Sequence, residues 1–81
     1  MSENWKLKNK LKLARVANGD LTQQQLADLV SCSRQTIISI ENAKFVPSIE
    51  LSLKIAKVLQ TPLENIFYLE QEETTSESEN K

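Results

Sequence analysis

The stretch that decides the fold is Leu21–Asn42, which reads LTQQQLADLVSCSRQTIISIEN. Its first part predicts a helix after Thr22, because Thr22 and Gln25 have the spacing of a capping box. In that motif the hydroxyl accepts a hydrogen bond from a free amide of the first turn, and the glutamine reaches back to the cap. Leu26 and the apolar residues after it supply the inward face of this helix.

A second helix follows a short polar break at residues 31–33, where Ser33 can serve as its cap. Its inward side chains are Ile37 and Ile40, which lie three residues apart. Two short helices joined by a tight turn push the second helix out from the body of the protein. In that position the second helix can enter the major groove of DNA, with its N-terminal residues at the base edges.

The outward face of this second helix carries groups suited to reading base pairs. Arg34 can donate two hydrogen bonds to a guanine, and Gln35 can pair bidentately with an adenine. Ser39 and Ile38 lie on the same outward face. Ile38 either contacts a thymine methyl group or is an ordinary exposed apolar residue or partner contact.

On the N-terminal side, the segment Trp5–Lys8 alternates apolar and charged residues, which favours a short extended piece, although its leucine also fits a helical stripe. We expect a helix from Lys10 to about Ala17, with Asn9 as its N-cap. Gly19 is the only glycine in the chain, and it can supply the positive φ that ends this helix.

On the C-terminal side, Ser48 predicts the start of a helix from Ile49 to Leu59 that has two apolar stripes. One stripe indicates a partner surface, because a short chain has little core to bury it in: Leu51, Ile55 and Val58. The loop before this helix carries Phe45 and Val46, which we expect to pack against the core.

A last short helix is expected after a second capping box, formed by Thr61 and Glu64 with Pro62 at the first helical position. The apolar and aromatic run Ile66–Leu69 follows it and could form a strand.

The composition excludes several classes of function. The chain has 81 residues, which is one domain, with one cysteine and no histidine. This rules out a disulfide within the chain, a His/Cys metal cluster and histidine acid–base catalysis, so we expect no enzyme and no cofactor. Cys32 is interpreted as a small buried apolar residue, or else as a redox-sensing thiol. The N-terminus has no signal-peptide pattern and no run is long enough to span a membrane, which predicts a cytoplasmic protein.

The formal net charge of −1 conceals two regions of opposite sign. Residues 1–69 carry a net charge of +3, whereas residues 70–81 carry −4 and contain no apolar side chain. We therefore expect a mildly basic domain over 1–69 and a disordered acidic tail over 70–81. The tail either keeps the chain soluble or competes with DNA for the basic surface.

Several runs at their spacing resemble the Cro/cI-type (XRE) helix-turn-helix family. The quoted stretch carries most of the likeness, in Leu21–Ala27, Ser33–Ile37 and Ile40–Asn42. Pro47-Ser48, Leu53–Ala56 with Leu59, and Pro62–Phe67 are similar to its compact branch, which includes the cytolysin repressor. The likeness covers about residues 9–69, with Ser31 and Ala43 at turn positions where the family often has glycine.

The resemblance implies an all-α, five-helix fold of the lambda repressor type, in which the two chain ends pair as a small antiparallel sheet. It implies a homodimer on a palindromic operator, and a pair between Arg15 and Glu41. The implied base contacts are Arg34, Gln35, Ile38 and Ser39, and the implied phosphate contacts are Thr22, Gln23, Thr36, Asn42 and Lys44. The expected dimer interface combines the apolar stripe of the helix at residues 49–59 with the run at residues 66–69: Leu51, Ile55, Val58, Ile66, Phe67, Tyr68 and Leu69.

These observations favour a transcriptional regulator that binds double-stranded DNA, acting as a repressor through the helix at residues 33–42. The alternative is a protein-interaction module, an antitoxin or adaptor, that uses the same fold to hold a partner. No feature of the sequence indicates a small-molecule ligand.

Overall fold

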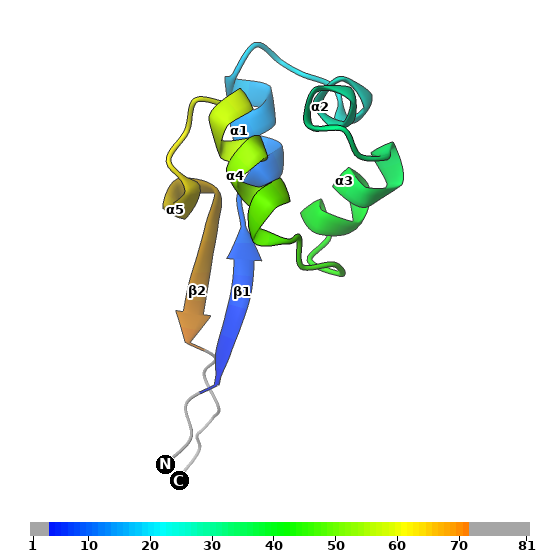
Figure 1. The fold of residues 1–81 in the computed structure, drawn as a ribbon. Coiled ribbons are helices and arrows are strands. Elements are labelled where there is room, and N and C mark those ends of the chain that lie inside the picture. The colour runs from blue at the N-terminus through cyan, green and yellow to red at the C-terminus, as the bar shows by residue number, and fades with distance from the viewer. Residues whose placement is uncertain (1–3, 72–81) are drawn as a thin grey trace, which may run out of the picture.

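The computed structural model describes residues 4–71, which form a helical body with a two-stranded ribbon projecting from it (Figure 1). The elements follow the order β1 (Trp5–Asn9), α1 (Leu11–Ala17), α2 (Gln23–Val30), α3 (Arg34–Glu41), α4 (Ile49–Val58), α5 (Leu63–Ile66) and β2 (Phe67–Gln71). Over the described residues, the expected five-helix fold with a small sheet from the two chain ends is confirmed.

Three of the helices begin at caps that the sequence predicts. The Thr22 side chain accepts from the Gln25 amide at 3.0 Å, and the Gln25 side chain accepts from the Thr22 amide at 2.8 Å, so the capping box before α2 is complete. Ser33 and Ser48 cap α3 and α4 with their own side chains, which accept a backbone hydrogen bond without the reciprocal bond of a capping box. Each cap satisfies an amide that the first turn of a helix leaves without a partner.

The second expected capping box, before α5, is wrong. The Thr61 hydroxyl donates instead to the carbonyl of Leu59 at 2.8 Å, and Pro62 occupies the N-cap position without a side-chain hydrogen bond. Because the Thr61 hydroxyl is bonded to the carbonyl at the end of α4, α5 begins without a side-chain cap.

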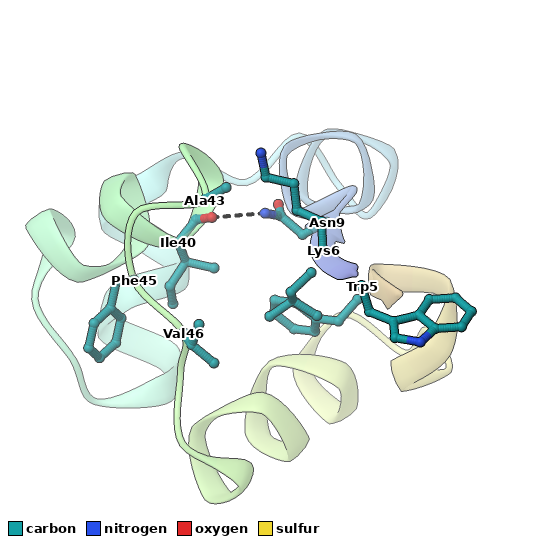
Figure 2. Close-up of a pocket in the computed structure, with 9 residues that line it drawn as sticks. Trp5, Lys6, Asn9, Ile40, Ala43, Phe45 and Val46 are labelled. Carbon is teal, nitrogen blue, oxygen red and sulfur yellow. Dashed lines mark hydrogen bonds between the residues drawn. The ribbon is translucent and has the colours of Figure 1, made fainter. Parts of the chain in front are cut away.

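Asn9 joins three elements at the base of the ribbon. Its side-chain oxygen accepts from the Leu11 amide at 3.1 Å. The N-cap of α1 is nevertheless Lys10, so the prediction of Asn9 as the cap is wrong by one residue and α1 begins at Leu11. Its side-chain nitrogen donates to the carbonyl of Ile40 near the end of α3 at 2.9 Å, shown as the dashed line in Figure 2. The ribbon is therefore fixed relative to α3 as well as to α1.

Helices α1 to α4 are each followed within two residues by a residue with left-handed backbone conformation. Gly19 has the expected positive φ, at 87°, but Ser31, Ala43 and Gln60 also have φ between 51° and 63°. After α3, the Ala43 amide donates to Ile40 and the Lys44 amide to Ser39, both at 2.9 Å, which is the Schellman pattern. Ser31 and Ala43 thus adopt the conformation for which a glycine is usual.

The buried core draws on α1–α5 and is entirely aliphatic: Leu11, Leu26, Ala27, Val30, Ile37, Ile40, Ile55, Leu59 and Ile66. The prediction that Ile55 and Ile66 belong to a dimer interface is therefore wrong, because both side chains are fully buried in the core of a single chain. The exposed apolar side chains of α4 are Ile49, at 78% exposure, and Leu53, which is about half exposed. Phe45 and Val46 are also exposed rather than packed on the core.

The ribbon pairs β1 and β2 antiparallel, with Leu7 opposite Leu69 and Asn9 opposite Phe67. Residues directly opposite one another share a face of a sheet, so Leu7, Phe67 and Leu69 lie on one face and the charged residues Lys6, Lys8 and Glu70 on the other. Strand β2 continues to Gln71, so residues 70 and 71 belong to the sheet and not to the predicted tail. The rest of that predicted tail, residues 72–81, lies outside the described residues.

Candidate nucleic-acid interface

The N-terminal half of α3 presents its polar side chains to solvent. Arg34 and Gln35, in the first turn, are exposed, whereas Ile38 and Ser39 are half-buried. The opposite side of the helix is anchored in the core by Ile37 and Ile40. Rigid anchoring on one side with free polar groups on the other is what a base-reading helix needs.

A shallow hollow beside α3 brings several of the predicted contact residues together. Its lining joins the cap, one side of α3 and the following loop: Ser33, Gln35, Thr36, Ser39, Lys44 and Phe45. Two predicted base contacts and two predicted phosphate contacts therefore adjoin the same hollow. Arg34 and Ile38 are not among its lining residues.

Phe45 is the residue of this surface that sequence reasoning missed. It lines the hollow beside α3 and is 47% exposed. Apolar side chains in this position can contact a thymine methyl group. The sequence could have indicated Phe45 as a contact residue, because it directly follows Lys44 in the predicted contact loop.

The start of α2 forms a second part of the surface. Thr22 and Gln23 stand there as predicted, with Thr22 exposed and Gln23 half-buried. Within residues 4–71 the backbone amides of Gln23 and Gln24 donate no hydrogen bond, as expected for the first turn of a helix. Free amides at a positive helix end attract a phosphate group.

Arg15 and Glu41 form a buried ion pair, as the resemblance implied. Arg15 Nε lies 2.8 Å from Glu41 Oε2, and its Nη2 donates to Oε1 at 3.2 Å. A third donor, Nη1, bonds the carbonyl of Leu21 at 2.7 Å. The side chain of Gln23 completes the cluster, because its Nε2 donates to Glu41 Oε1 at 3.1 Å. One arginine thus connects α1, the approach to α2 and the end of α3.

Cys32 lies in the turn between α2 and α3, packed against the core and partly buried. Burial raises the pKa of its thiol above the ordinary value. A reactive thiol needs a lowered pKa, so the environment of Cys32 favours the structural interpretation over redox sensing.

Basic side chains are few on this surface. Between residues 21 and 47 the only ones are Arg34 and Lys44. Lys6, Lys8 and Lys10 belong to the ribbon and its junction with α1, where Lys8 pairs with Glu70 and Lys10 lies over the ring of Tyr68. The surface can hydrogen-bond bases and a few phosphates, but it offers little long-range attraction for a polyanion.

No helix of the described range 4–71 is both long and apolar enough to cross a membrane.

Known proteins resemble this chain in sequence and in fold. A family model described as Helix-turn-helix matches residues 11–66. An uncharacterized HTH-type transcriptional regulator of Methanocaldococcus jannaschii is 48% identical over 67 residues, covering 83% of this chain and all of that protein. One from Bacillus subtilis is 41% identical over 66 residues, covering 82% of this chain and 98% of its own length.

Among solved structures, the crystal structure of a "putative DNA-binding protein" from Bacteroides fragilis superposes with a TM-score of 0.68. It covers 75% of this chain and 97% of its own, at 23% identity, and so supports the fold alone. The matched range contains the whole of α2 and α3, and each relative is matched over nearly its full length. The chain therefore belongs to the XRE-type helix-turn-helix family of transcriptional regulators.

Proposed function

We propose that this protein binds a specific double-stranded DNA operator as a homodimer and represses transcription by occupying it. The observation that carries the proposal is the exposed first turn of α3, where Arg34 and Gln35 extend from a helix anchored by Ile37 and Ile40. Arg34 is assigned to a guanine and Gln35 to an adenine. Ile38 and Ser39 are assigned to neighbouring base edges. Repression in this way needs no cofactor, because binding alone blocks the operator.

Phosphate contacts on both sides of the groove set the position of α3. Thr22, Gln23 and the free amides of α2 are assigned to one strand. The residues assigned to the other strand lie in the first turn of α3, at its C-cap and in the loop beyond it: Thr36, Asn42 and Lys44. Few of these groups are charged, so one subunit gains little affinity from phosphates.

Dimerisation supplies the affinity that one subunit lacks, by placing two recognition helices about 34–36 Å apart, one turn of DNA. The apolar face of the ribbon is the proposed contact, because Leu69 is 61% exposed there and Phe67 and Leu7 lie beside it. Leu7 and Phe67 also line a groove with Ile49, which extends this face onto α4. Of the interface residues predicted from sequence, Phe67 and Leu69 belong to this face. Tyr68 lies on the opposite face of the ribbon beneath Lys10, and Leu51 and Val58 are partly buried against the core.

Selection of bound sequences from a random DNA pool tests the proposal, followed by binding measurements on the selected operator. With Arg34→Ala, discrimination at one base pair per half-site should fall by a factor of about 5–150, which corresponds to 1–3 kcal/mol. Lys54→Ala, on α4 away from the contact surface, is the control and should leave base discrimination unchanged. Affinity should also fall as salt rises, because phosphate contacts release counterions.

The outcome against the proposal is a chain that enriches no sequence and whose weak DNA binding is unaffected by Arg34→Ala. If an unrelated protein then copurifies with the chain, the antitoxin or adaptor function replaces it. The exposed apolar side chains of α4 would in that case be the partner surface.

A further inference from the structure

The side chain of Glu41 is buried, yet it holds one of the side chains assigned to the proposed DNA surface. Its carboxylate is only 7% exposed and accepts three hydrogen bonds, two from Arg15 and one from Gln23. The two partners differ in kind. Arg15 is a buried counterion, whereas Gln23 is the first residue of α2 and is half-exposed.

A glutamine side-chain nitrogen carries two protons and can donate two hydrogen bonds. In this structure one N–H of Gln23 Nε2 points at Glu41 Oε1, at 3.1 Å. The amide is planar, so fixing one N–H also fixes the direction of the other. Within residues 4–71 Gln23 Nε2 makes no other hydrogen bond, so its second N–H remains available to a ligand near the start of α2.

The charge of Glu41 would by itself repel a phosphate near Gln23. The guanidinium of Arg15 offsets that charge with two hydrogen bonds, of 2.8 and 3.2 Å, and both groups are largely buried. Arg15 also bonds the carbonyl of Leu21, the residue just before the Thr22 cap, which fixes where α2 begins relative to α3. The cluster can therefore hold Gln23 without adding a net negative charge at the surface.

We infer that Glu41 is a positioning residue for DNA binding, which acts by holding the side-chain amide of Gln23 so that its second N–H meets a DNA phosphate. This inference rests on the proposed function, because it assigns a role within the same surface. A preset side chain loses less conformational entropy when the complex forms, and pre-organisation of this kind raises affinity without a new contact.

A coupling measurement on the selected operator tests this role. Arg15→Met with Glu41→Leu removes the acceptor from Gln23 and leaves no buried charge unpaired, a kind of exchange that folded proteins often tolerate. The affinity of this double variant is compared with the unmodified protein, with Gln23→Ala, and with the triple variant. Circular dichroism and thermal melting establish that each variant is folded.

The expected result is non-additive. The Arg15/Glu41 exchange should weaken operator binding roughly threefold to tenfold per subunit while Gln23 is present, about the value of one hydrogen bond, and should have no effect after Gln23→Ala. The same exchange combined with Arg34→Ala is the control, and there the two effects should add. Equal weakening with and without Gln23 would show a merely structural role and overturn the inference.

A measurement on the unmodified protein decides the matter even if the exchanged variants fail to fold. In the free protein the ¹⁵Nε2 group of Gln23 should have a higher order parameter than that of exposed Gln35, because only Gln23 is held by a carboxylate. Equal mobility of the two side chains contradicts the inference. Failure of the unmodified protein to bind any DNA would instead refute the proposed function, so the two failures are distinct.

Discussion

Replacing Ala43 by glycine should stabilise the protein, although glycine usually weakens a fold. Ala43 has a φ of 60° at the end of α3, and an L-residue in this left-handed conformation costs roughly 1–2 kcal/mol relative to the right-handed one. Glycine removes that cost but loses about 0.4–1 kcal/mol through the greater freedom of the unfolded chain. Ala43 is exposed, so the lost methyl group contributes little.

The difference between the middles of these two ranges is a net gain of about 0.8 kcal/mol, which corresponds to a rise in melting temperature of roughly 3–6 °C for a domain of this size. Urea denaturation followed by circular dichroism measures the gain, with an unchanged denaturant slope as the sign that only stability has changed. Ala17→Gly is the matched control: it makes the same replacement at the exposed last residue of α1, where it should cost up to about 1 kcal/mol. If both variants lose stability alike, the strain assigned to Ala43 is refuted.

Three further predictions concern the interface, the buried pair and the thiol. Leu69→Asp should convert the proposed dimer to a folded monomer in sedimentation experiments. Leu13→Asp, on the exposed side of α1, should leave the proposed dimer intact, and a dimer that survives Leu69→Asp argues against the ribbon interface. Arg15→Ala leaves the buried Glu41 carboxylate without its counterion and should lower the free energy of unfolding, measured in urea, by about 3–5 kcal/mol. Lys8→Ala removes an exposed pair and should lower it by only about 0–1 kcal/mol. Similar losses in the two variants would show that burial of the pair does not matter here. Because the pKa of Cys32 is raised in the folded state, its contribution to stability is fully present below the ordinary value of 9.0 and is lost as the pH rises above it. The urea midpoint should therefore fall above that pH, and Ellman's reagent should react more slowly with the folded chain than with the unfolded one. Equal rates of reaction would contradict this.

Features set by neighbouring residues were predictable from the sequence. The caps at Thr22, Ser33 and Ser48 depend on contacts within three residues, and the structure has all three. The side chain of Thr61 had a competing partner at Leu59, which the spacing of a capping box does not reveal.

Features set by contacts distant in the sequence were predictable only in part. Periodicity showed that α4 has two apolar stripes, but not that Ile55 would face the core and Ile49 the solvent, because that choice depends on where the other helices lie. The exposed position of Phe45 follows in the same way from the path of the loop after α3. The candidate DNA contacts Arg34 and Gln35 were predictable because the inward pair Ile37 and Ile40 leaves them only the outer side of a short helix.

The pairing of β1 with β2 has a consequence for the order in which the chain folds. Leu7 lies opposite Leu69, so the ribbon closes a loop that includes every helix of the described chain. Closing so long a loop is entropically costly and slow, whereas α2 and α3 are neighbours in sequence and can associate early. A nascent chain can therefore assemble α2 and α3 before its ribbon exists. If the ribbon is the dimer contact, subunits can associate only after β1 and β2 have paired, so a chain that has not yet formed β2 cannot dimerise.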